Sequence, residues 1–310
     1  MGSRDCGDER MTAAGEPRVS VLLLTRDGMA TLPAVLDQLA AQRTDFAVEV
    51  VAVDSGSRDG TAELLAQRVD RVLTIAPREF DHGATRNLGV EACRGELVVL
   101  LVQDALPVGI DWLAQLTAPL FADPTLAGTY ARQQPRPEAS ALTRFYLDGW
   151  VATANEPRVQ AVADAAAFAA LSPYERLAVC TFDDVCSCIR RAAWRAIPFR
   201  PTPIAEDVEW ARDVLLAGWR LRYTPEAVVI HSHERSARHE LRRTRESHAR
   251  LAALFGLRTI PTAGALLRAW AGALRTHLRV TARQPRELPR ALALAVALPL
   301  GQYLGGREAA

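Results

Sequence analysis

Three short apolar segments of this sequence each end in polar, acid-bearing residues. The polar stretches are Thr25 to Asp27, Asp54 to Thr61, and Gln103 with Asp104. Short, continuously apolar segments are typical of strands buried on both faces of a parallel sheet. Because ligands bind beyond the carboxyl ends of such strands, we expect the three stretches to share one ligand-binding edge.

Two carboxylates in these stretches are suited to binding a ligand. Asp54 stands at a strand end, where its oxygens accept hydrogen bonds from a ribose or a base, whereas Asp59 is better explained as a helix cap. A carboxylate directly after a buried strand, as Asp104 is, is costly unless it is paired or bound to a cation. Hard divalent ions prefer oxygen ligands, so Asp104 is predicted to bind a metal with diphosphate oxygens. The alternative, a cap of the next helix, is disfavoured by Pro107 and Gly109.

Three further motifs lie later in the chain or on a helix. His231-Ser232-His233 follows an apolar segment, and this spacing places both imidazoles on one side of a strand end, as in many metal sites. Exposed loop histidines are an equally good interpretation. Glu206-Asp207 opens a predicted helix, where the helix dipole alone favours acids. Arg86 lies one turn into another helix, from which it either reaches a phosphate or faces solvent.

The elements that must position these residues alternate between strands and helices. Apolar segments predict strands at 18–24, 48–53, 71–75 and 96–102, and amphipathic segments predict helices at 30–42, 61–68 and 84–93. Short connections between alternating elements predict a doubly wound α/β unit.

The second half of the chain is less regular. Further strands are predicted at 185–189, 221–223 and 227–230, and helices at 206–217 and 238–255, each followed by a glycine stop. The segment 132–180 has aromatic residues but no clear periodicity. Two more helices are expected after Pro261. We therefore predict a loose tail at 1–17, a ligand-binding domain at 18–235 and a helical region at 236–310.

Composition limits the class of protein. The chain has 310 residues, 49% of them hydrophobic, and a net charge of +1, so neither disorder nor a nucleic-acid partner is expected. Five cysteines without a regular framework, and no secretory leader, predict a reducing, cytoplasmic compartment. Cys186 and Cys188 are expected to be core residues. No apolar run is long enough for a transmembrane helix, and 291–304 is expected to be a packed helix rather than an interfacial anchor.

Five segments together resemble the family 2 glycosyltransferases, which have the GT-A fold. They are VSVLLLTRDG (19–28), VVAVDSGSRDGT (50–61), FDHGATRNLG (80–89), GELVVLLVQDALP (95–107) and AEDVEWARDVLLAGWRLRYTPEAVVIHSH (205–233). Each segment is weak alone, but their order and spacing are specific. FDHGATRN and QDALP, followed by CSCIRRAAW and AEDVEWA, resemble the rhamnosyltransferase branch of the family.

The resemblance implies an α/β, GT-A type, doubly wound and mostly parallel sheet with a C-terminal helical extension. It implies an inverting hexosyltransferase that moves a sugar from a nucleotide diphosphate donor to the hydroxyl of a glycan or glycolipid acceptor. The implied donor is dTDP-rhamnose, and the implied process is the assembly of a cell-surface polysaccharide or glycolipid. It also implies a divalent ion, Mg²⁺ or Mn²⁺.

The resemblance further assigns roles to residues of this chain. Asp207 is the catalytic base, and Glu206 and Trp210 lie on the acceptor side. The metal ligands are Asp104 and His231, which is preferred to His233. The donor-binding residues are Thr25, Arg26, Asp54, Ser57, Arg86, Gln103 and Asp104. The chain departs from the D-x-D motif of the family, because Val102 replaces its first acid, and this departure puts metal affinity in question.

Two other functions compete with this one. A nucleotidyltransferase needs a glycine-rich loop after the first strand, and Thr25 to Gly28 contains a single glycine. A non-catalytic, degenerate nucleotide-sugar-binding protein is consistent with Val102 but not with an intact set of Asp104, Asp207 and His231. The arginine-rich helix from Arg238 also allows peripheral contact with the inner face of a membrane, although its interspersed glutamates favour a solvated helix face.

Overall fold

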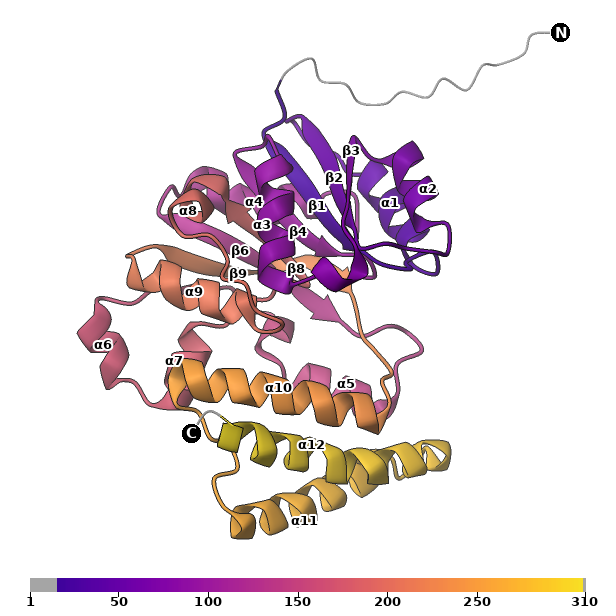
Figure 1. Ribbon diagram of the computed structural model, residues 1–310, viewed down its shortest axis with the longest axis vertical. Helices are drawn as coiled ribbons and strands as arrows, with labels where there is room; N and C mark the ends of the chain where they lie inside the picture. Colours follow the sequence, from indigo (N-terminus) through magenta and orange to yellow (C-terminus); the bar gives the residue numbers. More distant parts are fainter. Residues whose placement is uncertain (1–15, 309–310) are drawn as a thin grey trace, which may run out of the picture.

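The computed structural model describes residues 16–308, so Cys6 and most of the predicted tail at 1–17 lie outside the described part. A nine-stranded sheet forms its centre. The strands are β1 (Val19–Thr25), β2 (Val48–Asp54), β3 (Arg71–Thr74), β4 (Leu97–Val102), β5 (Leu106–Pro107), β6 (Leu126–Gln134), β7 (Arg158–Gln160), β8 (Cys186–Arg190) and β9 (Arg220–Ile230). The predicted α/β fold class is confirmed (Figure 1).

Helices cover both faces of this sheet and extend beyond it. The α-helices are α1 (Leu32–Ala40), α2 (Thr61–Arg68), α3 (His82–Ala92), α4 (Trp112–Ala122), α5 (Ala141–Asp148), α6 (Ala165–Ala170), α7 (Pro173–Val179), α8 (Arg191–Ala196), α9 (Glu206–Leu216), α10 (Ala237–Phe255), α11 (Ala263–Val280) and α12 (Leu288–Glu308). Short 3₁₀ turns are η1 (Pro77–Glu79), η2 (Val151–Thr153) and η3 (Pro285–Glu287).

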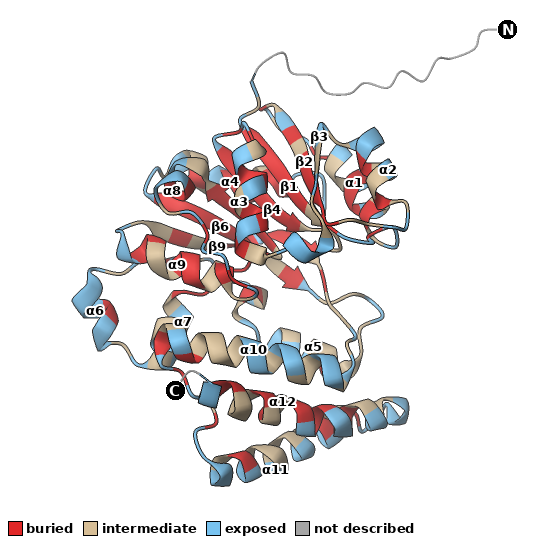
Figure 2. Ribbon diagram, viewed as in Figure 1, coloured by how far each residue is buried: buried red, intermediate tan, exposed pale blue. Residues whose placement is uncertain are grey.

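The first four strands form the parallel part of the sheet. β1 lies between β2 and β4, and β3 pairs with β2, all in parallel. Successive side chains of β1 enter different cores. Leu22 packs on the face covered by α3, α8 and α9, whereas Val21 and Leu23 pack on the opposite face, under α1, α2 and α4. Burial on both faces explains why these strands are apolar at consecutive positions, and Figure 2 shows the sheet as the most buried layer.

Beyond β4 the sheet is mixed. β8 lies antiparallel between β4 and β6, β9 runs parallel to β6, and β5 and β7 pair antiparallel with β9. The predicted parallel pairing therefore applies to β1 to β4 and to β6 with β9, and antiparallel strands join these parts. An apolar segment covered on both faces has the same sequence pattern in either direction, so its composition does not indicate the direction of pairing.

The two strands predicted at 221–223 and 227–230 are one strand, β9. Its register against β6 jumps from Ala131↔Thr224 to Arg132↔Val228. The extra residues between the two registers include Pro225, which has no N–H to donate to a ladder and is tolerated at such an irregularity. The strand therefore continues through the bulge and brings His231 to the site.

The C-terminal helices pack as a layer beside the sheet domain, on the side toward which the parallel strands point (Figure 1). α12 approaches α10 so closely that a Cβ on Gly305 would clash with the carbonyl oxygen of Arg245. The predicted packed helix at 291–304 is thus confirmed on the side of α12 that faces α10, whereas Leu292 and Val296 on another side are exposed. α10 lies between the sheet domain and α12, and its Arg250 pairs with Glu209, whereas Arg238, Arg242 and Arg243 near its start are exposed. Within residues 16–308, no helix is both long and apolar enough to cross a bilayer.

Candidate active site

The predicted convergence of three loops at one edge of the sheet is confirmed. Gln103, after β4, is joined to the loop after β1: its Oε1 accepts from the backbone N–H of Arg26 at 2.8 Å, and its Nε2 donates to the carbonyl of Arg26 at 2.9 Å. The backbone N–H of Asp27 donates to Ser57 Oγ, after β2, at 2.8 Å. The residues predicted to bind the donor from these loops therefore belong to one hydrogen-bond network, in which Thr25 and Asp54 are buried.

Asp54 is the centre of the second loop and is 1% exposed. Its Oδ1 accepts from Thr25 Oγ1 at 3.0 Å and from Ser57 Oγ at 2.5 Å, and its Oδ2 accepts from the backbone N–H of Ser57 at 2.9 Å. Gly56 completes the turn with a φ of +73°, which favours glycine. The N-cap residue of α2 is Gly60, but Asp59, directly before it, accepts from the backbone N–H of Thr61 in the first turn.

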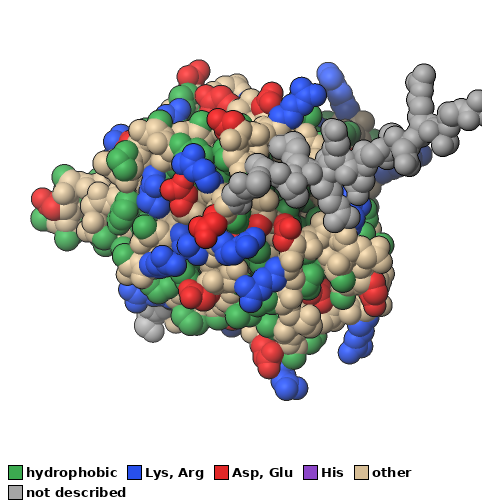
Figure 3. All heavy atoms as spheres, turned by 90° about the horizontal axis from the view of Figure 1, so that it is seen from above, with side chains coloured by type: hydrophobic (Ala, Val, Ile, Leu, Met, Phe, Trp, Pro, Cys, Tyr) green, Lys and Arg blue, Asp and Glu red, His purple; other side chains and the backbone are tan. Residues whose placement is uncertain are grey.

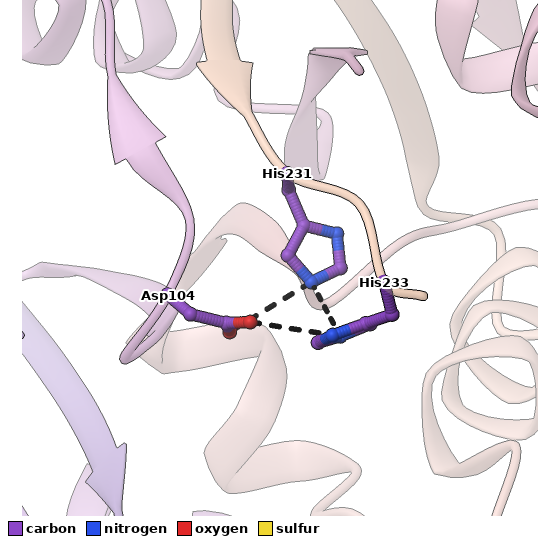
Figure 4. A group of neighbouring side chains, drawn as sticks. All are labelled: Asp104, His231 and His233. Atoms are coloured by element: carbon purple, nitrogen blue, oxygen red, sulfur yellow. Dashed lines mark hydrogen bonds and ion pairs between the residues drawn. The ribbon is translucent and has the colours of Figure 1, made fainter. Parts of the chain in front are cut away.

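Asp104, His231 and His233 form a cluster at the ends of β4 and β9 (Figure 4). His231 Nε2 lies 3.7 Å from Asp104 Oδ1, His233 Nε2 lies 3.6 Å from Asp104 Oδ2, and the two Nε2 atoms are 3.0 Å apart. Because oxygen and nitrogen ligands bond metals at roughly 2.0–2.6 Å, atoms at these separations can share one ion. Burial lowers the pKa of His231 to about 4 and also lowers the pKa of His233, so both imidazoles are neutral, as metal ligands must be. The three side chains fit a divalent ion.

The orientation of His231 is determined by a chain of buried hydrogen bonds. Asp183 Oδ1 accepts from the backbone N–H of Val185 at 3.0 Å, and its Oδ2 accepts from the indole Nε1 of Trp150 at 3.0 Å. A carboxylate only accepts, so the Gln133 amide that lies 2.5 Å from Oδ2 presents its Nε2. Gln133 Oε1 then faces His231 Nδ1 at 3.0 Å. His231 must carry its proton on Nδ1, which leaves Nε2 free to bind a metal.

Replacing Gln133 with leucine is expected to weaken Mn²⁺ binding by about 10–100-fold, because the tautomer and ring orientation of His231 are no longer held. Isothermal titration of Mn²⁺ in the presence of a nucleotide diphosphate measures this effect. Gln134→Leu is the matched control, since Gln134 is the adjacent, exposed glutamine of the same strand. Equal Mn²⁺ affinities in the wild type and Gln133→Leu would contradict the role.

Asp207 lies in a second cluster, at the start of α9. Its Oδ1 accepts from the backbone N–H of Val208 at 2.7 Å, and its Oδ2 from that of Asp184 at 3.5 Å. Ala205, directly before the helix, has a φ of +60°, which is strained for a residue with a side chain. Strain of this kind persists only where the surrounding structure holds the backbone in place.

A buried arginine is shared by the carboxylates around Asp207. Arg86 Nη1 lies 2.7 Å from Glu206 Oε1, and Arg86 Nε lies 2.9 Å from Asp184 Oδ2. Burial would lower the pKa of Arg86, but the charges of Glu206 and Asp184 outweigh it and raise that pKa. Arg86 is therefore not solvent-facing, and its contact with the donor stays a prediction.

Two carboxyl groups of this cluster, those of Asp184 and Asp207, hold their protons more tightly than ordinary acids. Burial raises the pKa of Asp184 to about 6. Burial also raises the pKa of Asp207 well above its usual range, and the negative charges of Glu206, Asp184 and Asp183 add to this shift. A carboxylate with a raised pKa is a stronger base, which suits it to accept a proton near neutral pH.

Glu206 and Trp210, which the resemblance places on the acceptor side, are both buried. Glu206 is buried, and its carboxylate pairs with Arg86. Trp210 is 1% exposed, donates from Nε1 to the carbonyl of Ile197 at 2.8 Å, and packs its ring against Phe182 and Phe199. Trp210 is thus a core residue that anchors α9, because the side of the helix it occupies faces the sheet.

Sequence reasoning missed Asp183, Asp184 and Gln133. Asp183 and Asp184 closely precede the apolar strand β8, just as Asp104 follows β4, so the cost of carboxylates beside a buried strand was a signal that could have identified both. Gln133 gives no such signal, since a glutamine near the end of a strand is equally common at the surface.

Comparison with known proteins agrees with this geometry. Residues 17–250 match the family model described as glycosyltransferase like family 2. The chain is 28% identical over 232 residues to the O-antigen chain rhamnosyltransferase RfbN of Salmonella typhimurium, covering 73% of this chain and 70% of the relative. It is 27% identical to the O-antigen chain rhamnosyltransferase WbaN of Salmonella anatum, covering 65% of this chain and 62% of that relative, which is less than two thirds of its length.

Solved structures show the same fold at lower identity. The mannosyltransferase PcManGT from Pyrobaculum calidifontis, determined with GDP-Man and Mn²⁺, has a TM-score of 0.60 at 19% identity, covering 94% of this chain and 88% of that one. Glucosyl-3-phosphoglycerate synthase from Mycobacterium tuberculosis has a TM-score of 0.54 at 19% identity, covering 80% and 82%. The fold is therefore GT-A, and the chain belongs to glycosyltransferase family 2, with rhamnosyltransferases among its relatives.

Proposed function

We propose that this glycosyltransferase is an inverting enzyme that moves rhamnose from dTDP-rhamnose to a hydroxyl of a glycan or glycolipid acceptor in cell-surface polysaccharide assembly. The observation that carries the proposal is the presence of two neighbouring clusters. Asp104, His231 and His233 form one, and Asp207, Glu206 and Asp184 form the other. Gln133 and Asp183 link them by hydrogen bonds. The names of the relatives support the donor sugar. We further propose that residues 18–235 form the catalytic domain and that 236–310 are its helical extension, acting at the cytoplasmic face of a membrane.

Each cluster has one task in the proposed reaction. Asp104, His231 and His233 would hold a divalent ion, which neutralises charge on the leaving diphosphate when bound. Mg²⁺ prefers oxygen ligands, whereas two of these three ligands are imidazoles. The related fold of PcManGT was determined with Mn²⁺, so Mn²⁺ is the ion we expect. Thr25, Asp54, Ser57, Arg26 and Gln103 would line the nucleoside side of the donor.

Asp207 would remove the proton of the acceptor hydroxyl as its oxygen attacks the anomeric carbon. The new carbon–oxygen bond forms on the face opposite the leaving diphosphate, the bond to the diphosphate breaks, and its electron pair leaves with that group. A single displacement of this kind inverts the anomeric centre. A base contributes about 10²–10⁴-fold to such a step.

Thermal unfolding with nucleotide diphosphates and their sugars, each with Mn²⁺, Mg²⁺ or chelator, tests the donor and the metal. A ligand at about 100 times its dissociation constant should stabilise the fold by about 2.7 kcal/mol. We expect this stabilisation with dTDP or dTDP-rhamnose in the presence of Mn²⁺. Asp104→Ala removes one of the three metal ligands, so we expect it to lose the part of the stabilisation that depends on the metal. Asp111→Ala is the control, as an exposed acid near the same strand end.

The outcomes separate the competing functions. A shift with UDP or GDP instead would keep nucleotide-sugar transfer and reject rhamnose as the donor sugar. Equal nucleotide affinity with metal and with chelator, in the wild type and Asp104→Ala alike, would contradict the metal site. No shift with any nucleotide would favour the non-catalytic alternative.

A further inference from the structure

The outer face of α11 and α12 is apolar and uncovered. Leu267, Leu274 and Leu278 are 63%, 41% and 43% exposed, and their spacing of seven and four residues places them on one stripe of α11. Leu292 and Val296 of α12, which are 41% and 53% exposed, continue the face. A groove runs between the two helices; it is lined by Trp270, Ala271, Leu274, Leu292, Ala295 and Val296. Figure 2 shows α11 as the outermost layer, with exposed residues along it.

A row of arginines borders this apolar face. Arg268, Arg275 and Arg279 each follow one leucine of the stripe, so they lie about 100° further round α11. All three are exposed and form no ion pair with any residue between 16 and 308. We call these three residues the arginine row.

Positive charge is concentrated in this part of the chain. Residues 258–300 contain seven arginines and one acid, Glu287, a net charge of +6, whereas the whole chain carries +1. The remainder is therefore net negative, by five charges. At the opposite end of the molecule, seen in Figure 3, positive and negative side chains are interspersed.

We propose that this face, the leucine stripe with Leu292, Val296 and the arginine row, docks on the surface of an anionic lipid bilayer. Apolar side chains enter the interface between headgroups and acyl chains, while flanking arginines stay at the anionic headgroups. A second copy of the chain is a poorer occupant, because a symmetric contact would bring two rows of three arginines together. No described helix spans a bilayer, so the helices lie on it.

The docking face is tied to the acid cluster through one short helix. Tyr146 of α5 lies with its hydroxyl 2.6 Å from Nε2 of the buried His277 of α11. Trp150, just after α5, donates to Asp183. Docking would therefore hold α5, and with it the part of the site around Asp183, close to the membrane. The docking itself needs neither donor nor acceptor, so its test is independent of the proposed activity.

Co-sedimentation of the full chain with vesicles tests the inference. We expect binding to vesicles of phosphatidylcholine with about one third phosphatidylglycerol, weaker binding to phosphatidylcholine alone, and a loss of binding as salt rises. Arg275→Glu/Arg279→Glu should reduce binding to anionic vesicles at least about tenfold, since each arginine near the surface contributes about 1 kcal/mol. Leu274→Ser/Leu278→Ser should also reduce it, on vesicles of both compositions.

The matched control is Leu216→Ser/Arg195→Glu, which changes an exposed leucine and an exposed arginine of the sheet domain. It should bind as the wild type does. Circular dichroism and the melting temperature establish that each variant is folded. Binding that all three double variants retain, or no binding to anionic vesicles at low salt, would overturn the proposal. A dimer in solution that Leu274→Ser/Leu278→Ser abolishes, without vesicle binding, would assign the face to a second copy and likewise overturn it.

Discussion

Asp207→Asn is expected to lower kcat by about 10²–10⁴-fold while leaving nucleotide affinity unchanged, because the amide keeps the shape of the side chain but cannot accept the acceptor's proton. Single-turnover transfer measures the first quantity and titration with a nucleotide diphosphate the second. Asp213→Asn is the matched control: it makes the same change further along α9, where Asp213 pairs with Arg200 and Arg212. Near-normal turnover of Asp207→Asn would refute the assignment of the base.

The pH dependence of the wild type follows from the same cluster. Burial and the charge of Glu206 raise the pKa of Asp207, so kcat/KM should rise with pH through an apparent pKa well above 3.8. Glu206→Gln removes a negative charge beside Asp207 and should move this rise to lower pH. A profile whose acid limb stays near pH 4 in the wild type would contradict the raised pKa.

Arg86→Met is expected to destabilise the protein by about 3–5 kcal/mol, because it removes the cation from a buried group of carboxylates. The free energy of unfolding in urea measures the loss. Arg200→Met is the control, since the side chain of Arg200 is 62% exposed and its partners Asp213 and Glu209 also pair with Arg212 and Arg250, so that neither acid is left without a cation. Exposed pairs contribute at most about 1 kcal/mol.

The destabilisation of Arg86→Met should shrink as the pH falls. Without the cation, the folded-state pKa of Asp184 rises further above its unfolded value, so the folded variant binds more protons than the wild type does. Protonation then removes the uncompensated charge, so the difference between the variant and the wild type narrows as the pH falls toward about 6, where Asp184 of the wild type is protonated as well. A difference that is constant between about pH 5 and pH 8 would show that lost packing, rather than charge, dominates.

The local elements were predictable because each has its own signal in the sequence. Apolar segments located β1, β2 and β4, and the glycine after α9 and the glycine after α10 marked the ends of those helices. The direction of β8 was not predictable, since burial on both faces imposes the same composition on parallel and antiparallel strands. The bulge in β9 was not predictable either. Pro225 interrupts the apolar pattern of the strand, although the pairing of β9 with β6 continues beyond it.

The site likewise has residues that the sequence could identify and contacts that it could not. Asp104, His231 and Asp207 could be singled out because polar residues that follow a buried strand or open a helix need an explanation of their own. Which side chains they meet depends on pairings between β4, β6, β8 and β9, which are distant in the sequence. The sequence by itself determined the elements and the acids and imidazoles at their ends. Only the tertiary structure decided that Gln133 orients His231, that Arg86 forms ion pairs with Glu206 and Asp184, and that Trp210 is buried. Contacts of this kind depend on how distant segments of the chain pack.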